Sequence, residues 1–208
     1  MVHYKLTYFQ VRGLGESIRL ILTHSGQKWE EVNPDFQGWQ GSPLKEKTPF
    51  GKLPVLEVDG KPLAETFAIC RYLSKKYGLA GKDDWEQAKV DEIADFHKDV
   101  ALEIGPFFRV FFGFAPGDKD KMHKEVFLPA VEKYFPTYVR ALKESGSGFL
   151  TKGGLTWPDF LVAEFLTTIN NIDSTILKKY PELEQYRQRV HSQPTIKSYV
   201  AGRKHSVV

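Results

Sequence analysis

The chain has 208 residues, 41% of them hydrophobic and 26% charged, with a net charge of +3. These values are typical of a globular chain with a sizeable core, in one large or two small domains, and they exclude disordered, collagen-like and disulfide-dense proteins. The longest apolar runs, such as residues 110–115, are far shorter than the roughly 18 to 20 residues of a transmembrane helix. We therefore expect no membrane span.

The positive charge is unevenly distributed, because residues 1–80 contain 11 Lys and Arg against 8 Asp and Glu and so hold the whole excess. This excess favours a small anionic ligand but is too small and too dispersed for nucleic-acid binding. Cys70 is the single cysteine, which excludes an internal disulfide and a Cys-x-x-Cys redox pair. Any thiol chemistry must therefore come from a substrate.

The first half of the N-terminal region predicts strand, helix and strand. Residues 4–9 are β-prone, a glycine-rich turn covers 13–16, and apolar spacing over 18–22 indicates a helix. Residues 29–33 predict a second strand, and 34–47 form a polar segment without a clear pattern. Because no charged and then apolar leader precedes the first strand, we expect a cytoplasmic protein, with leaderless export left open.

The second half of this region predicts a hairpin and a helix. Residues 53–63 alternate as two strands around Asp59 and Gly60, a strong turn signal. Apolar spacing over 65–77, ended by Gly78, predicts a helix with a left-handed C-terminal cap. The fold class is thus an α/β unit of the order βαβ and then ββα, followed by an all-α part.

Strand signals are absent from the remainder of the chain, which reads as helical. We place an N-terminal domain at 1–79, a linker at 80–82 and a helical domain at 83–208. Three- and four-residue spacing of apolar side chains predicts a long helix over 90–111, and another helix covers 181–193.

Two further helices carry local signals. The pattern over 127–142 is helical, but Pro129 and Pro136 should bend or cut that helix. The sequence TWPD at 156–159 is typical of a capping box with proline at the first helical position. The helix after it, over 157–169, is apolar nearly all round and should be central to the helical domain.

Five sequence segments together carry a resemblance to a known family. They are YKLTYF at 4–9, RG at 12–13, PFGKLPVLEVDG at 49–60, AICRYL at 68–73 and LTWPDF at 155–160. The chain resembles the cytosolic glutathione transferases, and within them the sigma class, including nematode sigma-like enzymes and glutathione-dependent prostaglandin D synthase. The resemblance implies a thioredoxin-like N-terminal domain that binds glutathione and a helical domain that contributes a hydrophobic electrophile site.

Tyr8 receives the catalytic role from this resemblance. A free thiol with a pKa near 8.5 is only a few per cent ionised at neutral pH, so the site must stabilise the glutathione thiolate. A phenolic hydroxyl at the end of a strand can donate a hydrogen bond to that sulfur from a rigid support. Without the other motifs, Tyr8 would read as an ordinary strand aromatic.

The resemblance assigns further residues to glutathione. A cis peptide at Pro54 would turn the backbone of Leu53 toward the cysteinyl part, Thr66 would bind the γ-glutamyl carboxylate, and Glu65 stands where the family commonly has Gln. The whole predicted set, with Trp39 and the two lysines at the glycine end, is Tyr8, Trp39, Lys45, Gly51, Lys52, Leu53, Pro54, Glu65 and Thr66.

Two positions bear on assembly and metals. Asp99 matches an aspartate that reaches the glutathione of a neighbouring subunit, which implies a homodimer. Lys98 stands where the prostaglandin synthase branch has an acidic residue for a divalent ion, so we expect no metal site.

The electrophile pocket is expected between the two domains. Leu14 replaces an arginine that the prostaglandin synthase branch carries near the thiol, and Arg12 is expected to tie the two domains together. For Phe108 and Phe111 a core position is the preferred interpretation. The predicted lining is Tyr8, Val11, Leu14, Phe107, Phe108, Arg109, Phe111, Phe112 and Phe114.

Three functions follow from the resemblance. The leading one is conjugation of glutathione to hydrophobic electrophiles, including lipid peroxidation products. The second is glutathione-dependent isomerisation of a prostaglandin endoperoxide, against which Leu14 and Lys98 argue mildly. The third is a non-catalytic carrier of haem or other apolar anions, or a structural protein.

Overall fold

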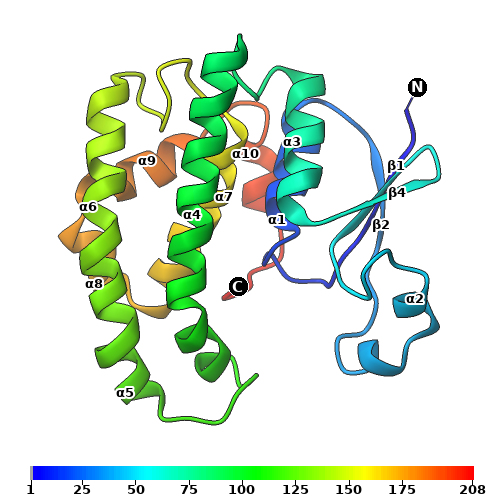
Figure 1. Ribbon diagram of the computed structural model, residues 1–208, viewed down its shortest axis with the longest axis horizontal. Helices are drawn as coiled ribbons and strands as arrows, with labels where there is room; N and C mark the ends of the chain where they lie inside the picture. The colour runs from blue at the N-terminus through cyan, green and yellow to red at the C-terminus, as the bar shows by residue number, and fades with distance from the viewer. Residues whose placement is uncertain (1) are drawn as a thin grey trace.

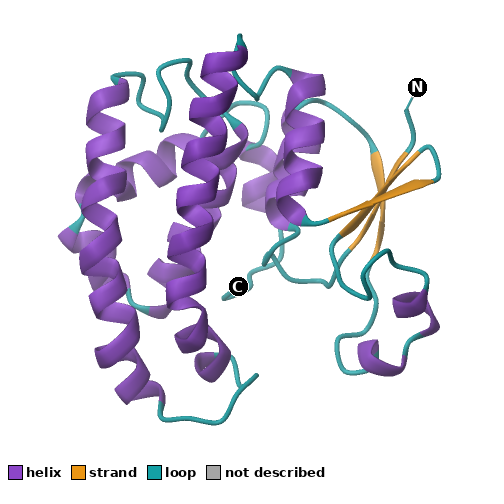
Figure 2. Cartoon of the chain, in the orientation of Figure 1, coloured by secondary structure: helices purple, strands orange, loops and turns teal. Residues whose placement is uncertain are grey.

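The computed structural model describes residues 2–208 and combines a four-stranded sheet on one side with a bundle of helices on the other (Figures 1 and 2). The strands lie in the order β2, β1, β3, β4. β1 (Tyr4–Thr7) pairs in parallel with β2 (Trp29–Val32) and antiparallel with β3 (Val55–Val58), which pairs antiparallel with β4 (Lys61–Ala64). The order β1, α1, β2 and then β3, β4, α3 confirms the predicted α/β unit.

Helices α1 (Glu16–His24) and α3 (Thr66–Tyr77) lie between the sheet and the helical domain (Figure 1). Their buried side chains pack against those of β1, in which Tyr4 and Leu6 are fully buried. Gly78 ends α3 in the left-handed conformation at φ 75°, as the sequence predicts. This arrangement leaves the C-terminal end of β1 and the start of α3 at the same edge of the sheet.

The helical domain is built around two long helices that run side by side in Figure 1, α4 (Asp84–Phe111) and α6 (Leu128–Ser145). Behind them α7 (Trp157–Ile172) is buried along most of its length and contacts α1, α3, α4 and α9. The other elements are α5 (Lys119–Met122), a π-helical segment (His123–Phe127), α8 (Ser174–Lys179), α9 (Pro181–His191) and α10 (Lys197–Gly202).

The predicted capping box begins α7. The side chain of Asp159 accepts from the Thr156 backbone N–H at 2.7 Å. In return, the Asp159 backbone N–H is directed at the Thr156 side chain, which completes the capping box. Asp159 also accepts from the Leu150 N–H and the Tyr186 hydroxyl. Burial raises the pKa of this carboxyl to about 6, against the lowering effect of these hydrogen bonds.

Of the bend or cut expected at Pro136, the cut does not occur, because α6 continues through that residue. Pro136 and Glu132, whose carbonyl loses its helical donor, are both exposed, so water can satisfy that carbonyl. Pro129 lies in the first turn of α6, where proline costs no hydrogen bond.

The polar segment at 34–47 also contains structure that the sequence pattern does not reveal. It holds a 3-10 turn at Trp39–Gly41 and the short helix α2 (Pro43–Glu46), which begins at a Ser42 cap. Ser followed by Pro is a helix-start signal, but a single turn of helix produces no periodicity.

Arg12 joins the two domains, as the sequence analysis expects. Its guanidinium donates to the Glu164 carboxylate at 2.7 Å, to the Thr168 hydroxyl at 3.1 Å and to the Val207 carbonyl at 2.7 Å. Arg203 binds Glu164 and also Glu16 of α1. A buried ionic cluster therefore holds the turn after β1 against α7 and the C-terminal residues. Among residues 2–208 no helix is long and apolar enough to cross a membrane.

Candidate active site

Tyr8 stands directly after β1 and is only 7% exposed. Its backbone N–H donates to the Val32 carbonyl at 3.1 Å, which continues the pairing with β2. The ring lies against the turn before α1, where a side chain at Gly15 would place its first carbon 2.4 Å from the ring. Glycine is therefore required at position 15 to let the turn close on Tyr8.

The Tyr8 hydroxyl accepts a hydrogen bond from the Leu14 backbone N–H at 2.9 Å. Burial raises the pKa of Tyr8, while this N–H and the charge of Arg19 act in the opposite direction. The phenol is thus neutral at physiological pH. Since the oxygen already accepts the N–H, its own hydrogen is free to be donated to an anion in front of it.

Arg19 supports this geometry, and the sequence analysis did not single it out. It donates to the carbonyls of Val11 at 2.8 Å and Phe9 at 3.1 Å, and its guanidinium lies 5.7 Å from the centre of the Tyr8 ring. Carboxylates of Glu16 and Glu31 neutralise it. The one available signal was a Glu–Arg pair three residues apart in the first turn of α1.

The start of α3 meets the same turn. The Thr66 hydroxyl donates to the Leu14 carbonyl at 3.2 Å, so the backbone of Leu14 connects Thr66 with Tyr8 through its C=O and its N–H. Glu65 precedes the helix with a φ of 69°, an unusual conformation for a residue with a side chain, and is exposed. The Leu53–Pro54 peptide is cis, as predicted.

The remaining residues assigned to glutathione lie on or near the segment that contains α2. Trp39 is 7% exposed and packs edge-on against Phe9 at 5.8 Å between ring centres. The Lys45 ammonium donates to the Gln40 side chain at 2.6 Å, and its stem passes Gly51. Lys52 is exposed.

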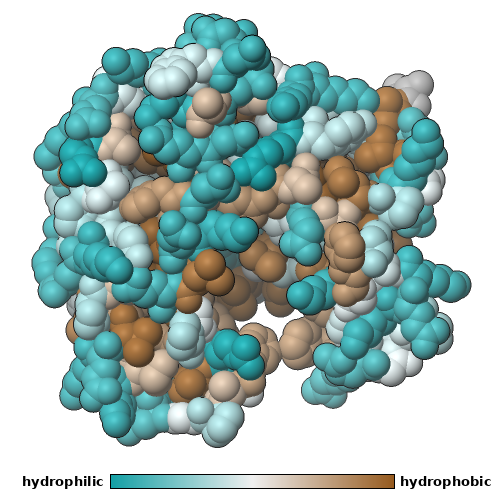
Figure 3. Space-filling view, in the orientation of Figure 1, coloured by the Kyte–Doolittle hydropathy of each residue, from teal (hydrophilic) through white to brown (hydrophobic). Residues whose placement is uncertain are grey.

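We call the residues of the N-terminal domain from Tyr8 to Thr66 that are assigned to glutathione the glutathione side of the cleft. We call the predicted lining residues of the electrophile pocket the electrophile side. Its members from the N-terminal domain, Val11 and Leu14, are 37% and 56% exposed. Figure 3 shows a hollow between the two domains, with hydrophobic surface on both walls.

Most of the predicted electrophile residues from α4 have exposed surface, but Phe107 does not. Phe107 is 1% exposed and stacks on Phe127 of the neighbouring π-helical segment at 4.7 Å, so it belongs to the core. Phe108 and Phe111 are half-buried against the core, in partial agreement with the core interpretation. Phe112 is half-buried, and Arg109 and Phe114 are exposed.

The prediction that Phe107 lines the electrophile pocket was wrong, because near its C-terminal end α4 packs against neighbouring helices as well as facing the cleft. Helical phase alone cannot tell which of two adjacent aromatic side chains faces the bundle and which faces the cleft. The ring packing with Phe127 decides it.

Other reactive groups are far less suited to chemistry. Burial raises the pKa of the Cys70 thiol to about 12, which leaves it protonated at neutral pH. Burial lowers the pKa of His97 to about 4, and its ring lies 2.8 Å from the Tyr138 hydroxyl as a neutral core group. Within residues 2–208 no group of three or more His, Cys, Asp or Glu side chains is placed to hold a metal ion. Asp99 is exposed on α4.

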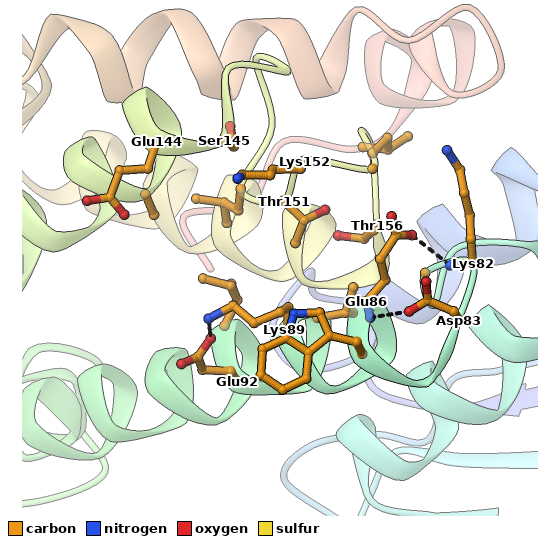
Figure 4. A pocket seen from close by; sticks show the side chains of 18 of the residues that line it. Lys82, Asp83, Glu86, Lys89, Glu92, Glu144, Ser145, Thr151, Lys152 and Thr156 are labelled. Atoms are coloured by element: carbon orange, nitrogen blue, oxygen red, sulfur yellow. Dashed lines mark hydrogen bonds and ion pairs between the residues drawn. The ribbon is translucent and has the colours of Figure 1, made fainter.

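A cavity of about 500 Å³ lies elsewhere, between the start of α4, the end of α6 and the loop before α7 (Figure 4). Its rim is polar, with Glu86 accepting from the Lys82 N–H and Lys89 paired with Glu92. None of the residues assigned to glutathione lines it. It is therefore a separate feature from the site around Tyr8.

Similar proteins identify the family. A model of the glutathione S-transferase N-terminal domain matches residues 4–75, and a model of the C-terminal domain matches 104–203. Glutathione S-transferase 1 of Ascaris suum is 43% identical, with 98% of each chain covered.

Two solved structures are similar over nearly the whole chain. Na-GST-3 of the hookworm Necator americanus, described as monomeric, is 45% identical with a TM-score of 0.91 and 98% of each chain covered. Prostaglandin synthase D of Nilaparvata lugens is 34% identical with a TM-score of 0.86, over 98% of this chain and 100% of that one. The chain therefore belongs to the glutathione transferase family of enzymes.

Proposed function

We propose that this enzyme acts in the cytoplasm and transfers glutathione to hydrophobic electrophiles, including lipid peroxidation products. The observation that supports this most directly is the Tyr8 hydroxyl, which accepts the Leu14 N–H at 2.9 Å and keeps its own hydrogen for a ligand. In the proposed reaction the glutathione thiol loses its proton to solvent and its sulfur forms a bond to the electrophilic carbon. The carbon then releases its leaving group or, in an unsaturated carbonyl compound, keeps the sulfur while the neighbouring α-carbon of the resulting enolate takes up a proton from solvent.

The energy required of Tyr8 is modest. Lowering the thiol pKa by two units corresponds to about 2.7 kcal/mol. A hydrogen bond to a charged group contributes about 1.5 to 3 kcal/mol, and burial of Tyr8 strengthens it by excluding water. A neutral, correctly oriented phenol is therefore sufficient, and Cys70 has no part in the step.

The glutathione side would bind the tripeptide along its length. Lys45, Lys52 and the Trp39 indole are placed in the proposal at the glycine carboxylate, a charge-assisted contact that agrees with the positive excess of residues 1–80. The backbone of Leu53, next to Pro54 and after Gly51, would pair with the cysteinyl part. The first N–H groups of α3 at Thr66 would receive the γ-glutamyl carboxylate, as helix N-termini favour anions.

Glu65 would serve the other charge of the γ-glutamyl end. A carboxylate cannot donate a hydrogen bond, but it can accept one from the α-ammonium group. Its φ of 69° is an outlier of the kind that concentrates at functional sites.

The electrophile would lie against Val11, Leu14, Phe108 and Phe112, with Arg109 at the edge. Phe107 is left out of this set because it belongs to the core. The exposed apolar surface of Leu14, at the position where the resemblance implies an arginine in the prostaglandin synthase branch, favours an apolar rather than an anionic substrate group close to the sulfur.

We further propose a homodimer in which Asp99 contributes to the partner's γ-glutamyl site. Asp99 and Leu102 are both exposed on α4, and Leu102 is 66% exposed, a large apolar side chain on a helix that already has a buried face. Sedimentation velocity at micromolar concentration tests this proposal. A monomer, the state described for Na-GST-3 of Necator americanus, would contradict it.

A second activity, isomerisation of a prostaglandin endoperoxide, is favoured by one observation, the similarity over the whole chain to a prostaglandin synthase. Turnover of the endoperoxide with glutathione tests it. The haem-carrier alternative depends on the same hydrophobic hollow, and quenching of tryptophan fluorescence by haem tests it.

The main experiment compares conjugation of an activated aryl halide and of a long-chain alkenal by the wild type, Tyr8→Phe and Tyr72→Phe. Tyr72 is an exposed tyrosine of α3, so its variant controls for the loss of a phenolic hydroxyl. We expect Tyr8→Phe to reduce kcat for both substrates by about 100-fold, since removal of one donor to a developing anion has effects of this size. Equal rates in Tyr8→Phe and wild type would contradict the proposed function.

A further inference from the structure

Two exposed aromatic side chains from different domains meet at the cleft. Phe36 follows β2 in the N-terminal domain and Phe114 follows α4 in the helical domain, and they are 55% and 56% exposed. Their ring centres are nevertheless only 5.5 Å apart. Single exposed aromatics are common on protein surfaces, but a pair that joins two domains is a structural feature.

Phe36 is held by the segment around it. The Gly38 N–H donates to the Asp35 carboxylate at 2.6 Å, and the buried Trp39 anchors the next turn. The Phe36 ring also packs edge-on against Phe9 at 5.0 Å. Its position is therefore fixed from the glutathione side of the cleft.

Phe114 is held by the end of α4. Its N–H donates to the Arg109 carbonyl at 2.7 Å, and the following Ala115 N–H donates to the same carbonyl at 3.0 Å. Its ring lies 6.3 Å from that of Phe112. The position of Phe114 is therefore fixed from the helical domain.

These contacts complete an arc of aromatic rings that begins at the catalytic tyrosine. From Tyr8 the steps are 5.6 Å to Phe9, 5.0 Å to Phe36 and 5.5 Å to Phe114, and the arc returns through Phe112 to α4. The arc thus joins residues of the N-terminal domain to residues of the helical domain. Phe36 and Phe114 are its outermost members and form the contact across the cleft.

We propose that Phe36 and Phe114 form an aromatic bridge that closes the outer side of the electrophile site and selects substrates with a long or flat apolar part. The inference rests on the proposed function, because it requires glutathione sulfur at Tyr8. A short electrophile stays between Tyr8, Val11 and Leu14 and does not reach the bridge. A long one extends along the arc and exchanges exposure to water for contact with both rings.

The bridge is also weak enough to open. Both rings are more than half exposed, so the contact between them buries little surface. A large substrate can therefore part the two rings on entry without disturbing the core of either domain.

The test is binding of S-alkylglutathiones, from S-methyl to S-nonyl, by isothermal titration calorimetry, which requires no turnover. In the wild type we expect affinity to rise by about fourfold per methylene over the longer chains, as for burial of apolar groups. In Phe36→Ala and Phe114→Ala the rise should become smaller for the longest chains, so that S-nonylglutathione binds about tenfold more weakly while S-methylglutathione changes by less than about twofold.

Two controls make the result specific. Phe114→Tyr keeps the ring and should retain the wild-type rise, and Trp85→Ala, which removes an aromatic side chain that is 75% exposed at the start of α4, should have no effect. The double variant should bind S-nonylglutathione no more weakly than either single variant, since loss of one ring already removes the bridge.

An unchanged rise in both alanine variants, or an equal loss in Trp85→Ala, would overturn the bridge and leave the proposed function intact. Failure of S-methylglutathione to bind the wild type would overturn the glutathione site itself, and the bridge with it. The shortest ligand therefore separates the two failures.

Discussion

The two sides of the cleft are built in different ways. On the glutathione side, Tyr8 is 7% exposed, a glycine lies against its ring, and the backbone of Leu14 is hydrogen-bonded to both Tyr8 and Thr66. On the electrophile side, Leu14 and Phe114 are more than half exposed. The short turn before α1 contributes to both sides of the cleft. The backbone of Leu14 contacts Tyr8, and the Leu14 side chain belongs to the electrophile side.

This difference matches two different tasks. One substrate is always the same tripeptide, so its site can be rigid and bonded in every direction. The other substrate varies, and apolar contacts without fixed direction tolerate variation in shape. Substitutions on the glutathione side should therefore change rates sharply, and those on the electrophile side should change preference.

The largest effect, on stability, is expected at Arg12, because this residue joins the two domains that form the two sides of the cleft. Arg12→Met removes the guanidinium that Glu164, Thr168 and the Val207 carbonyl share, all in the buried boundary between the domains. We expect the free energy of unfolding to fall by about 4 kcal/mol, as for breaking a buried ion pair. Urea unfolding at neutral pH measures this loss.

A surface pair provides the control for Arg12. Arg140→Met breaks an exposed pair with Glu144 at 4.0 Å and should change stability by less than about 1 kcal/mol. Equal effects of the two substitutions would mean that the ionic cluster does not hold the domains together.

His97 tests the support behind the electrophile side, because its ring packs against Phe165, which in turn contacts Phe108. Burial lowers the pKa of His97 to about 4, against about 6.5 in the unfolded chain. Below pH 6.5 His97 is protonated in the unfolded chain but stays neutral in the folded one. The free energy of unfolding therefore decreases by about 3 kcal/mol as pH falls from about 6.5 to 4.

His97→Gln should flatten this part of the stability profile while leaving activity at neutral pH unchanged. Unfolding midpoints at several pH values between 4 and 7 measure it. A wild-type slope in the variant would show that other groups cause the acid loss.

Gly15→Ala tests the tight packing on the glutathione side. The added carbon would lie 2.4 Å from the Tyr8 ring, so either the turn or the ring must move. We expect kcat/KM to fall by about 100-fold, close to the loss from a misplaced catalytic group. Gly105→Ala in α4, where the added carbon meets nothing within 4 Å, should leave activity unchanged, and a similar loss there would reject this explanation.

The smallest effect is expected at the end of the tripeptide. Lys52→Ala should raise KM for glutathione about tenfold with kcat unchanged, because the proposed contact with the glycine carboxylate is the same in the ground and transition states. Lys61→Ala, at the exposed start of strand β4, is the matched control. A fall in kcat without a change in KM would place Lys52 in another role.

Local signals predicted the fold well. The turn at Asp59 and Gly60, the cap at Gly78 and the capping box at Thr156 are decided by residues within a few positions, and all three occur in the structure. Pro136 did not cut its helix, because exposure of that turn lets water replace a lost hydrogen bond.

The site depends on contacts that no local pattern contains. The facing of Phe107 is set by Phe127, and the approach of Phe36 to Phe114 joins residues from two domains. The support of Tyr8 by Arg19 likewise needs the folded turn. Resemblance to a family supplied Tyr8, Pro54 and Thr66, but not the groups that orient them.

The most direct test of the account is a titration of enzyme-bound glutathione, following thiolate absorbance against pH in the wild type and Tyr8→Phe. We expect a bound thiol pKa about two units below the free value in the wild type, close to 6.5, and a return toward 8.5 in Tyr8→Phe. Equal pKa values in the two proteins would contradict the claim that the Tyr8 hydroxyl stabilises the thiolate.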